Sequence, residues 1–208
     1  MMPVNDKELA RIRLRFIDLC KSFFLEQPDA EKLGRWRGII SALGNENINP
    51  GFDKAVRQME VLLSRKNLHD LQQEYYRLFV DPFNKWLVHT SASFYEDGHA
   101  FGPTLVRYRD FLGRAGLRLQ EDVHEADDSL VLLLDALASL IDREQKNPEN
   151  SRNLEAELIH GYLLSLSRKF SKSLQENPEA DFYRACSELL CRYIDMERGL
   201  FTETEAAA

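Results

Sequence analysis

The sequence predicts an all-α protein of roughly seven to nine helices, and three observations lead to this fold class. Apolar residues recur at spacings of three and four along most of the chain, which is the period of an amphipathic helix. No stretch alternates apolar and polar residues convincingly, and no internal repeat occurs. A chain of 208 residues is long enough to bury a core without disulfide or metal. We therefore expect one globular domain over residues 1–208, with a frayed tail from about residue 200.

The segment 124–145, HEADDSLVLLLDALASLIDREQ, is the predicted centre of this domain. It is apolar on almost every side, and such a helix is stable in water only when other helices surround it. Asp127 or Asp128 is expected to cap its first turn, because a carboxylate there accepts hydrogen bonds from free backbone N–H groups. The remaining helices are therefore expected to pack around this one.

Four helices are predicted before the centre, each with one apolar face. The first covers about 6–26 with an inward face that leaves its arginines outside; this face consists of Leu9, Ile12, Phe16, Leu19 and Phe23. Asp29 caps the second helix, which ends at Gly44. The third covers about 52–63, and Asn67 caps a fourth that extends to Phe79.

Three further helices are predicted besides the central one. Thr104 begins a short helix that ends at Gly116. Ser151 or Asn153 begins a long helix that extends to about Phe170, and Asp181 precedes the last one.

The segment 80–103, VDPFNKWLVHTSASFYEDGHAFGP, keeps neither the helical nor the strand period. A loop of this length in a compact domain is usually functional or disordered, and its many aromatic residues argue against disorder. We expect an ordered loop over the core that takes part in binding, or one that packs only its own aromatic rings.

The charge and the cysteines limit the classes of function. With 27 basic and 34 acidic residues, the net charge is −7, which argues against nucleic acid and favours neutral or cationic partners. Cys20, Cys186 and Cys191 are odd in number and lie in apolar helical contexts, so we expect reduced, buried thiols. No apolar run has transmembrane length and no signal peptide is present, which predicts a cytoplasmic protein without stable membrane insertion.

No specific catalytic motif occurs, and we predict neither catalytic residues, nor a metal, nor a cofactor. Glu-x-x-His occurs twice, at 121–124 and 157–160, and paired copies hold di-iron centres in helical bundles. However, Glu157 and His160 lie off the apolar face of their helix, so we expect them to face solvent. A di-iron or di-manganese carboxylate enzyme therefore stays an alternative, as does a general all-α protein-interaction module.

The connector before the central helix is strongly acidic, with five carboxylates between residues 121 and 128. It is either a solvated helix start or a functional rim. A rim would bind arginines, since carboxylates pair with guanidinium in a bidentate manner, beside an apolar groove for a peptide. That groove is expected between the segment 78–95 and the start of the central helix.

Several segments, in order, resemble the TorD, DmsD and NarJ family of chaperones that mature molybdenum-containing enzymes. The segment 75–82, YYRLFVDP, resembles the family's entry into its long loop, and 91–95 resembles the loop's serine and tyrosine stretch. The segments 106–117 and 181–183 resemble two further family segments. Asp128 matches the aspartate of an aspartate-histidine pair, whereas Ser129 replaces the histidine and Leu133 replaces a glutamate.

The resemblance implies a TorD-like, non-enzymatic chaperone in the cytoplasm. Such chaperones bind the twin-arginine signal peptide, or the apo form, of a molybdopterin oxidoreductase, assist cofactor insertion and delay export; they occur as monomers or domain-swapped dimers. From the resemblance and the residue pattern we predict that the partner is bound by Tyr76, Phe79, Pro82, Trp86, Ser91, Ser93, Tyr95, Glu125, Asp127, Asp128 and Ser129. Among these, Glu125, Asp127 and Asp128 are expected to meet the arginines.

Overall fold

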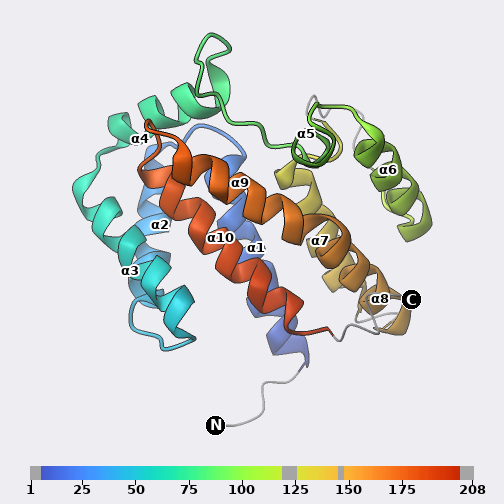
Figure 1. Cartoon of the computed structure of the whole chain (residues 1–208). Helices are drawn as coiled ribbons and strands as arrows, with labels where there is room; N and C mark the ends of the chain where they lie inside the picture. The colour runs from blue at the N-terminus through green and yellow to red at the C-terminus, as the bar shows by residue number, and fades with distance from the viewer. Residues whose placement is uncertain (1–5, 119–125, 145–147, 202–208) are drawn as a thin grey trace. The chain divides into compact units, whose positions relative to one another are not determined.

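A computed structural model describes residues 6–118, 126–144 and 148–201, and the regular structure in these ranges is helical. Its segments are α1 (Asp6–Phe24), α2 (Ala30–Leu43), α3 (Pro50–Arg65), α4 (Leu68–Tyr75), the π-helical η1 (Tyr76–Val80), α5 (Ala92–Asp97), α6 (Pro103–Ala115), α7 (Leu130–Glu144), α8 (Pro148–Leu158), the π-helical η2 (Ile159–Leu163), α9 (Leu164–Glu176) and α10 (Phe182–Arg198) (Figure 1). Because α4 continues into η1, and α8 continues through η2 into α9, the described ranges contain nine continuous helices. The predicted fold class is confirmed.

The chain divides into two compact units, each built from segments that are distant in sequence. Unit 1 comprises residues 1–18, 90–166 and 196–208, and unit 2 comprises residues 19–89 and 167–195. Helices α1, α9 and α10 contribute residues to both units. The single domain expected over residues 1–208 stays a prediction.

Unit 2 contains α2, α3 and α4, and the starts of α2 and α4 follow the predicted capping pattern. Asp29 accepts a hydrogen bond from the Lys32 N–H at 2.7 Å, and Asn67 forms a reciprocal capping box with Asp70. Helix α2 packs beside α3 (Figure 1). Within the unit, Trp36 is fully buried against Phe23 and Phe182, and its indole N–H donates to the Ser22 hydroxyl at 2.8 Å. An aromatic core with a satisfied polar group therefore stabilises this unit.

Unit 1 contains the predicted central helix as α7, which packs against α8. Nine of its residues are buried, and they lie on nearly all sides of the helix; they are Leu130, Val131, Leu132, Leu133, Leu134, Ala136, Leu137, Leu140 and Ile141. Helix α6 adds the stacked rings of Tyr108 and Phe111, and Tyr162 of η2 lies 5.2 Å from Tyr108. Gly116 ends α6 in the left-handed conformation at φ +61, as its sequence position predicts.

The inward face predicted for the first helix is wrong in its N-terminal half. Leu19 and Phe23 are buried, but Leu9 and Ile12 are more than one third exposed. Ala10, Arg13 and Ile17 face inward instead, so an arginine that was expected outside lies in the core. Arg13 is stabilised there by two buried carboxylates, which the apolar pattern does not reveal.

Two boundaries also differ from the sequence prediction. The expected loop 80–103 contains the six-residue helix α5, which is too short to show a period. The long helix begins at Pro148 rather than at Ser151 or Asn153, because proline is suited to the first turn of a helix.

The three cysteines are thiols rather than disulfides; Cys20 and Cys186 are buried, and Cys191 is partly buried. Burial raises the pKa of the Cys186 thiol, so this side chain is a neutral part of the core. Among the described residues, no helix has the length and apolarity needed to cross a membrane.

Candidate partner-binding site

In unit 2, the partner-binding residues predicted from the sequence lie at the end of α4 and in the turn that follows, which we call the aromatic turn (Asp81–Trp86). The π-helical η1 widens the last turn of the helix, and its end is closed by a hydrogen bond from the Asp81 N–H to the Tyr76 carbonyl at 2.9 Å. Asp81 Oδ1 then accepts from the Phe83 N–H, and Asn84 Oδ1 accepts from the Trp86 N–H, each at 3.0 Å. Side chains that bond to the backbone two residues later define tight turns, which explains this conformation.

The aromatic turn is also bonded to the connection between α9 and α10. Asn84 Nδ2 donates to the Arg77 carbonyl and to Glu179 Oε2, each at 2.8 Å. Asn177 Nδ2 donates to the Trp86 carbonyl at 2.8 Å. The backbone of the turn is thus held by several hydrogen bonds from within unit 2.

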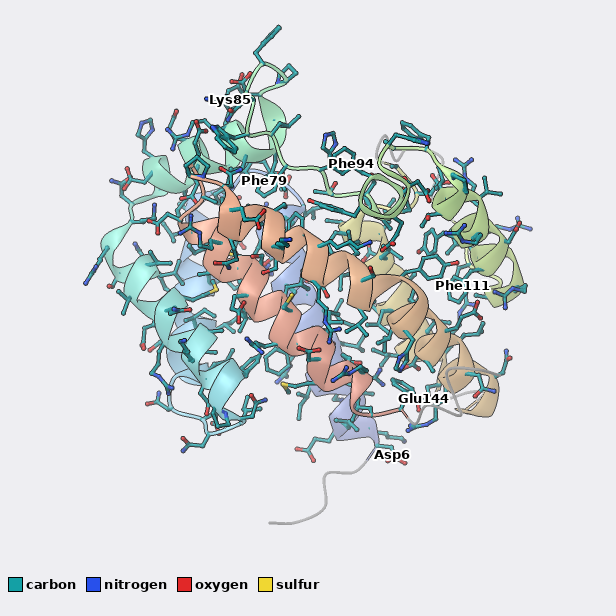
Figure 2. All side chains as sticks on the ribbon, in the orientation of Figure 1. Asp6, Phe79, Lys85, Phe94, Phe111 and Glu144 are labelled. Atoms are coloured by element: carbon teal, nitrogen blue, oxygen red, sulfur yellow. The ribbon has the colours of Figure 1, made fainter. Side chains whose placement is uncertain are left out.

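The side chains of the aromatic turn point mostly into solvent. Phe83 is 94% exposed, and Pro82, Tyr76 and Trp86 are exposed as well. Figure 2 labels Lys85 on this turn, and its ammonium lies 5.4 Å from the centre of the Trp86 ring. The turn therefore presents exposed apolar side chains on a backbone that hydrogen bonds hold in place.

Phe79 has a different place from its neighbours. It is half-buried, and its ring centre lies 5.2 to 6.4 Å from those of four aromatic rings; these belong to Phe24, Tyr75, Phe170 and Tyr183. Figure 2 labels it at the end of the helix that leads into the turn. Phe79 therefore joins the exposed aromatic turn to the core of unit 2.

In unit 1, Asp128 binds the first turn of α5. Its carbonyl accepts from the Ala92 N–H at 2.9 Å, and its Oδ2 accepts from the Ser93 N–H at 2.6 Å. Ser91 pairs with Ser129 in an isolated antiparallel bridge, and the Leu130 N–H donates to the Thr90 carbonyl at 2.9 Å. The residues before α5 and those before α7 are thus joined backbone to backbone.

The expectation that Asp127 or Asp128 caps the central helix is wrong. Ser129 Oγ accepts the Leu132 N–H at 3.3 Å and is the side chain that caps α7. Asp128 caps α5 instead, because the α5 N-cap residue, Ser91, makes no side-chain cap bond of its own. A sequence shows that a capping residue is present, but not which helix start lies near it.

The four residues Ser91, Ser93, Asp128 and Ser129 are all buried, and Asp128 has no exposed surface. Among the described residues, Asp128 Oδ1 and the nearby Tyr108 hydroxyl have no hydrogen-bond partner. Burial, together with the charges of neighbouring groups that include Asp128, raises the pKa of Tyr108 well above its ordinary value. Tyr108 is therefore neutral at neutral pH.

The remaining predicted residues in unit 1 are partly accessible. Asp127 pairs with Arg109 of α6, and a quarter of its side chain is exposed. Tyr95 is half-buried on α5 and packs edge-to-face against Phe94, which Figure 2 labels. Glu125 lies outside the described residues.

The predicted residues thus divide between the two units. Tyr76, Phe79, Pro82 and Trp86 belong to unit 2, whereas Ser91, Ser93, Tyr95, Asp127, Asp128 and Ser129 belong to unit 1. The binding role of each residue, and the groove expected among them, stay predictions.

The second Glu-x-x-His pair takes part in other contacts. Glu157 binds the Arg114 guanidinium with both carboxylate oxygens, and His160 is half-buried in η2. In the part of the chain that the structure describes, no three or more His, Cys, Asp or Glu residues are grouped so as to hold a metal ion. Glu121 and His124 lie outside that part.

Sequence reasoning missed one buried carboxylate that organises unit 2. Glu74 Oε1 accepts from the Asp181 N–H at 2.7 Å and the Tyr183 N–H at 3.0 Å, at the start of α10. Its Oε2 accepts from Lys66 Nζ at 3.1 Å. The position of Glu74 between Leu71 and Leu78 on the inward face of α4 was the signal that this carboxylate is buried.

Comparison with known proteins identifies the family of the chain. The sequence model of the family described as nitrate reductase delta subunit matches residues 45–172. The chain is 27% identical to the chaperone protein TorD of Vibrio vulnificus over 188 residues, which cover 83% of this chain and 86% of that protein. It is 25% identical to the chaperone protein TorD of Vibrio cholerae over 202 residues, which cover 88% and 90% of the two chains.

A solved structure shares the fold. It is a redox enzyme maturation protein of Archaeoglobus fulgidus, and it superposes with a TM-score of 0.53 at 17% identity, covering 88% of this chain and 94% of that one. The family and the relatives together define a non-enzymatic chaperone, and the solved structure shows its all-helical fold. The chain belongs to the nitrate reductase delta subunit family, and the resemblance to the TorD and NarJ chaperones is confirmed.

Proposed function

We propose that this chaperone acts in the cytoplasm on a molybdopterin-containing oxidoreductase. It binds the twin-arginine signal peptide of that enzyme, its apo form, or both, assists insertion of the cofactor and delays export. The partner is the catalytic subunit of the oxidoreductase, and the chaperone acts as a monomer or as a domain-swapped dimer. The membership of the chain in a chaperone family supports this proposal.

The aromatic turn is the single observation that supports the proposal most strongly. A signal peptide has an apolar segment, and binding it requires apolar side chains that are exposed before the partner arrives. Phe83, Trp86 and Tyr76 are exposed on a backbone that hydrogen bonds hold in place. Because the turn is already ordered, little conformational entropy is lost on binding.

The charge of the chain supports a cationic partner. The net charge of −7 favours association with a leader that carries two arginines, mainly through the rate of encounter. Of the two predicted acidic residues that the structure describes, Asp127 is partly exposed, and its present partner, Arg109, is an arginine. We propose that a leader arginine replaces Arg109 at this carboxylate.

The test is an affinity purification of the tagged chaperone from its native host under anaerobic respiration, with mass spectrometry of the bound proteins. Enrichment of a molybdopterin oxidoreductase subunit supports the proposal, and an intact leader on that subunit supports leader binding. Reproducible enrichment of an unrelated protein instead would favour the general interaction module. A Phe83→Ser variant and a Val61→Ser variant, which alters an exposed side chain of α3 in the same unit, serve as a matched pair.

A further inference from the structure

In unit 1, Phe101 is held in a conformation that its residue type disfavours. Its φ is +64, and no other described residue except glycine has a positive φ. A bulky side chain in the left-handed region is a true outlier, and such strain persists where the surrounding structure imposes it, commonly at functional positions. Two points therefore need an explanation, namely which contacts impose the positive φ and what the conformation contributes to function.

The cause is a short chain of hydrogen bonds from buried residues. The Phe101 N–H donates to Ser93 Oγ at 3.1 Å, and the Ser93 N–H donates to Asp128 Oδ2 at 2.6 Å. Ser93 and Asp128 have no exposed surface. The position of the Phe101 backbone is thus set by two residues that the family resemblance had suggested as direct contacts with the partner.

The other side of Phe101 is fixed as well. Asp97 accepts hydrogen bonds from the Thr104 N–H at 2.8 Å and the Thr104 hydroxyl at 2.9 Å. Gly102 lies so close to the Asp97 carboxylate that a Cβ atom there would overlap it. The connection between α5 and α6 is therefore closed tightly, with Phe101 at its outer side.

The Phe101 side chain contributes little buried surface to this unit. It is 70% exposed, and no described aromatic ring packs against it. Pro103 is exposed two residues later, and Val106 is 58% exposed one helical turn after Pro103 on the same face of α6. We call Phe101, Pro103 and Val106 the apolar knob.

We propose that the apolar knob is a docking surface for an apolar segment of the oxidoreductase polypeptide, and that Ser93 and Asp128 are positioning residues for Phe101. This inference rests on the proposed function and names a surface of unit 1 that the residues predicted from the sequence did not include. Fixed strain at an exposed aromatic side chain is what a preorganised contact requires, because the partner does not have to order it.

The features around the knob favour a polypeptide over other occupants. Charges of both signs lie on α6 and beside it: Arg107, Arg109 and Asp110 are exposed, and the partly exposed Asp127 pairs with Arg109. This part of unit 1 therefore lacks the cationic excess that attracts an anionic membrane. Three side chains are far too few for the roughly 800 Å² per partner that a stable dimer of this chain would bury. The residues that hold Phe101 lie within the segment 45–172 that matches the chaperone family.

The test compares four proteins in binding to the oxidoreductase subunit that the wild-type chaperone captures. These are the wild type, Phe101→Gly, Val106→Ser and the control Val61→Ser, which changes an exposed apolar residue of unit 2. Glycine adopts a positive φ without strain, so Phe101→Gly is expected to melt at the same or a higher temperature and to bind at least tenfold more weakly. Val106→Ser is expected to bind more weakly by about threefold or more, and Val61→Ser is expected to bind as the wild type does.

The outcomes separate the two proposals. If the wild type captures the oxidoreductase and Phe101→Gly binds it within twofold, the knob proposal is overturned and the proposed function stands. If Phe101→Gly loses both stability and binding, the result for Val106→Ser is decisive. Binding of Val106→Ser within twofold of the wild type then overturns the knob proposal. Failure of the wild type to bind any oxidoreductase overturns both proposals. If the wild type sediments with anionic phosphatidylglycerol vesicles and the two knob variants do not, the assignment of the knob to a polypeptide is overturned.

Discussion

Arg13 Nη2 lies 2.5 Å from Glu155 Oε2 in the core of unit 1, and both side chains are almost fully removed from solvent. Arg13 also binds Glu197 with Nε and Nη2, at 2.7 to 3.2 Å, and its Nη1 lies 3.6 Å from Glu144. One guanidinium thus faces three carboxylates, two of them buried. Burial, together with the charges of Glu144 and Glu197, raises the pKa of Glu155 to about 7 even though Arg13 opposes the shift.

This cluster predicts that the stability of the protein falls as the pH rises from about 4.5 to 8. Glu155 has an ordinary pKa of 4.5 when unfolded and about 7 when folded, so the folded state binds a proton more tightly. The resulting stabilisation is fully present below pH 4.5 and is lost as the pH rises through about 7. Since one pKa unit corresponds to about 1.4 kcal/mol, a shift from 4.5 to about 7 gives a change of at most about 3.5 kcal/mol.

Urea unfolding at several pH values measures this dependence, with Glu155→Gln as the variant. Glutamine keeps an acceptor for Arg13 and does not titrate, so the decline in stability between pH 5 and 8 is expected to flatten. The control Glu157→Gln removes a surface pair with Arg114 and is expected to keep the wild-type profile. An unchanged profile in Glu155→Gln would show that another group titrates.

A second prediction concerns Glu74, which binds two backbone N–H groups at the start of α10 and Lys66. Glu74→Ala leaves the two backbone N–H groups without this acceptor, while Lys66 keeps its pair with Asp181 at 2.9 Å, so we expect a loss of about 3 kcal/mol in the free energy of unfolding. Glu74→Gln keeps one acceptor and is expected to lose about half as much. Glu188→Ala, on the exposed face of α10, is the control and should change the stability by less than about 0.5 kcal/mol.

The helices could be predicted from the sequence because their apolar faces are long and their caps are local. Asn67 and Asp70 bond within one helical turn, and α7 is apolar on all sides, so no distant residue is needed to identify either element. The face of α1 could not be predicted in the same way. Arg13 is buried because Glu155 and Glu197 lie beside it, and these partners are 142 and 184 residues away in sequence.

The candidate site shows the same limit. The aromatic residues of the segment 80–103 were recognised, but the exposure of Phe83 and Phe101 depends on turns held by Asn84, Asn177 and Ser93. The sequence also placed Asp127 and Asp128 together on an acidic rim. In the structure only Asp127 is accessible, because Asp128 binds the start of α5.

A third prediction separates these two neighbouring aspartates. Asp128→Ala removes the acceptor of the Ser93 N–H in a buried position, so we expect a loss of about 2 kcal/mol in stability and faster amide hydrogen exchange at Ser93 and Phe101. Asp127→Ala removes only a partly exposed pair and should cost less than about 1 kcal/mol. Equal loss of stability in the two variants would contradict the assignment of Asp128 to the support of α5.

The same pair of variants tests the acidic contact with the leader. Asp127→Ala is expected to weaken the binding of a synthetic twin-arginine leader peptide by about tenfold at low salt, because a charge-assisted bond is lost. The difference from the wild type should shrink at high salt, since an exposed pair is screened. A leader with both arginines replaced by lysines serves as the control. Equal affinity of wild type and Asp127→Ala for the leader at low salt would contradict the proposed contact.

A final prediction concerns Phe83, whose side chain contributes almost no buried surface to the folded protein. Phe83→Ser should therefore change the free energy of unfolding by less than about 0.5 kcal/mol, as surface substitutions usually do. If the aromatic turn binds the apolar segment of the leader, the same change should weaken binding by about tenfold or more, because hot-spot aromatic residues contribute about 2 kcal/mol when truncated. Trp86 lies on the turn and is 37% exposed, whereas Trp36 is fully buried, so a change in tryptophan emission on binding reports on the turn. Titration of the leader into wild type, Phe83→Ser and Val61→Ser measures both effects. An equal midpoint in all three would show that Phe83 does not contribute to binding, and binding without a change in tryptophan emission would place the leader away from the turn.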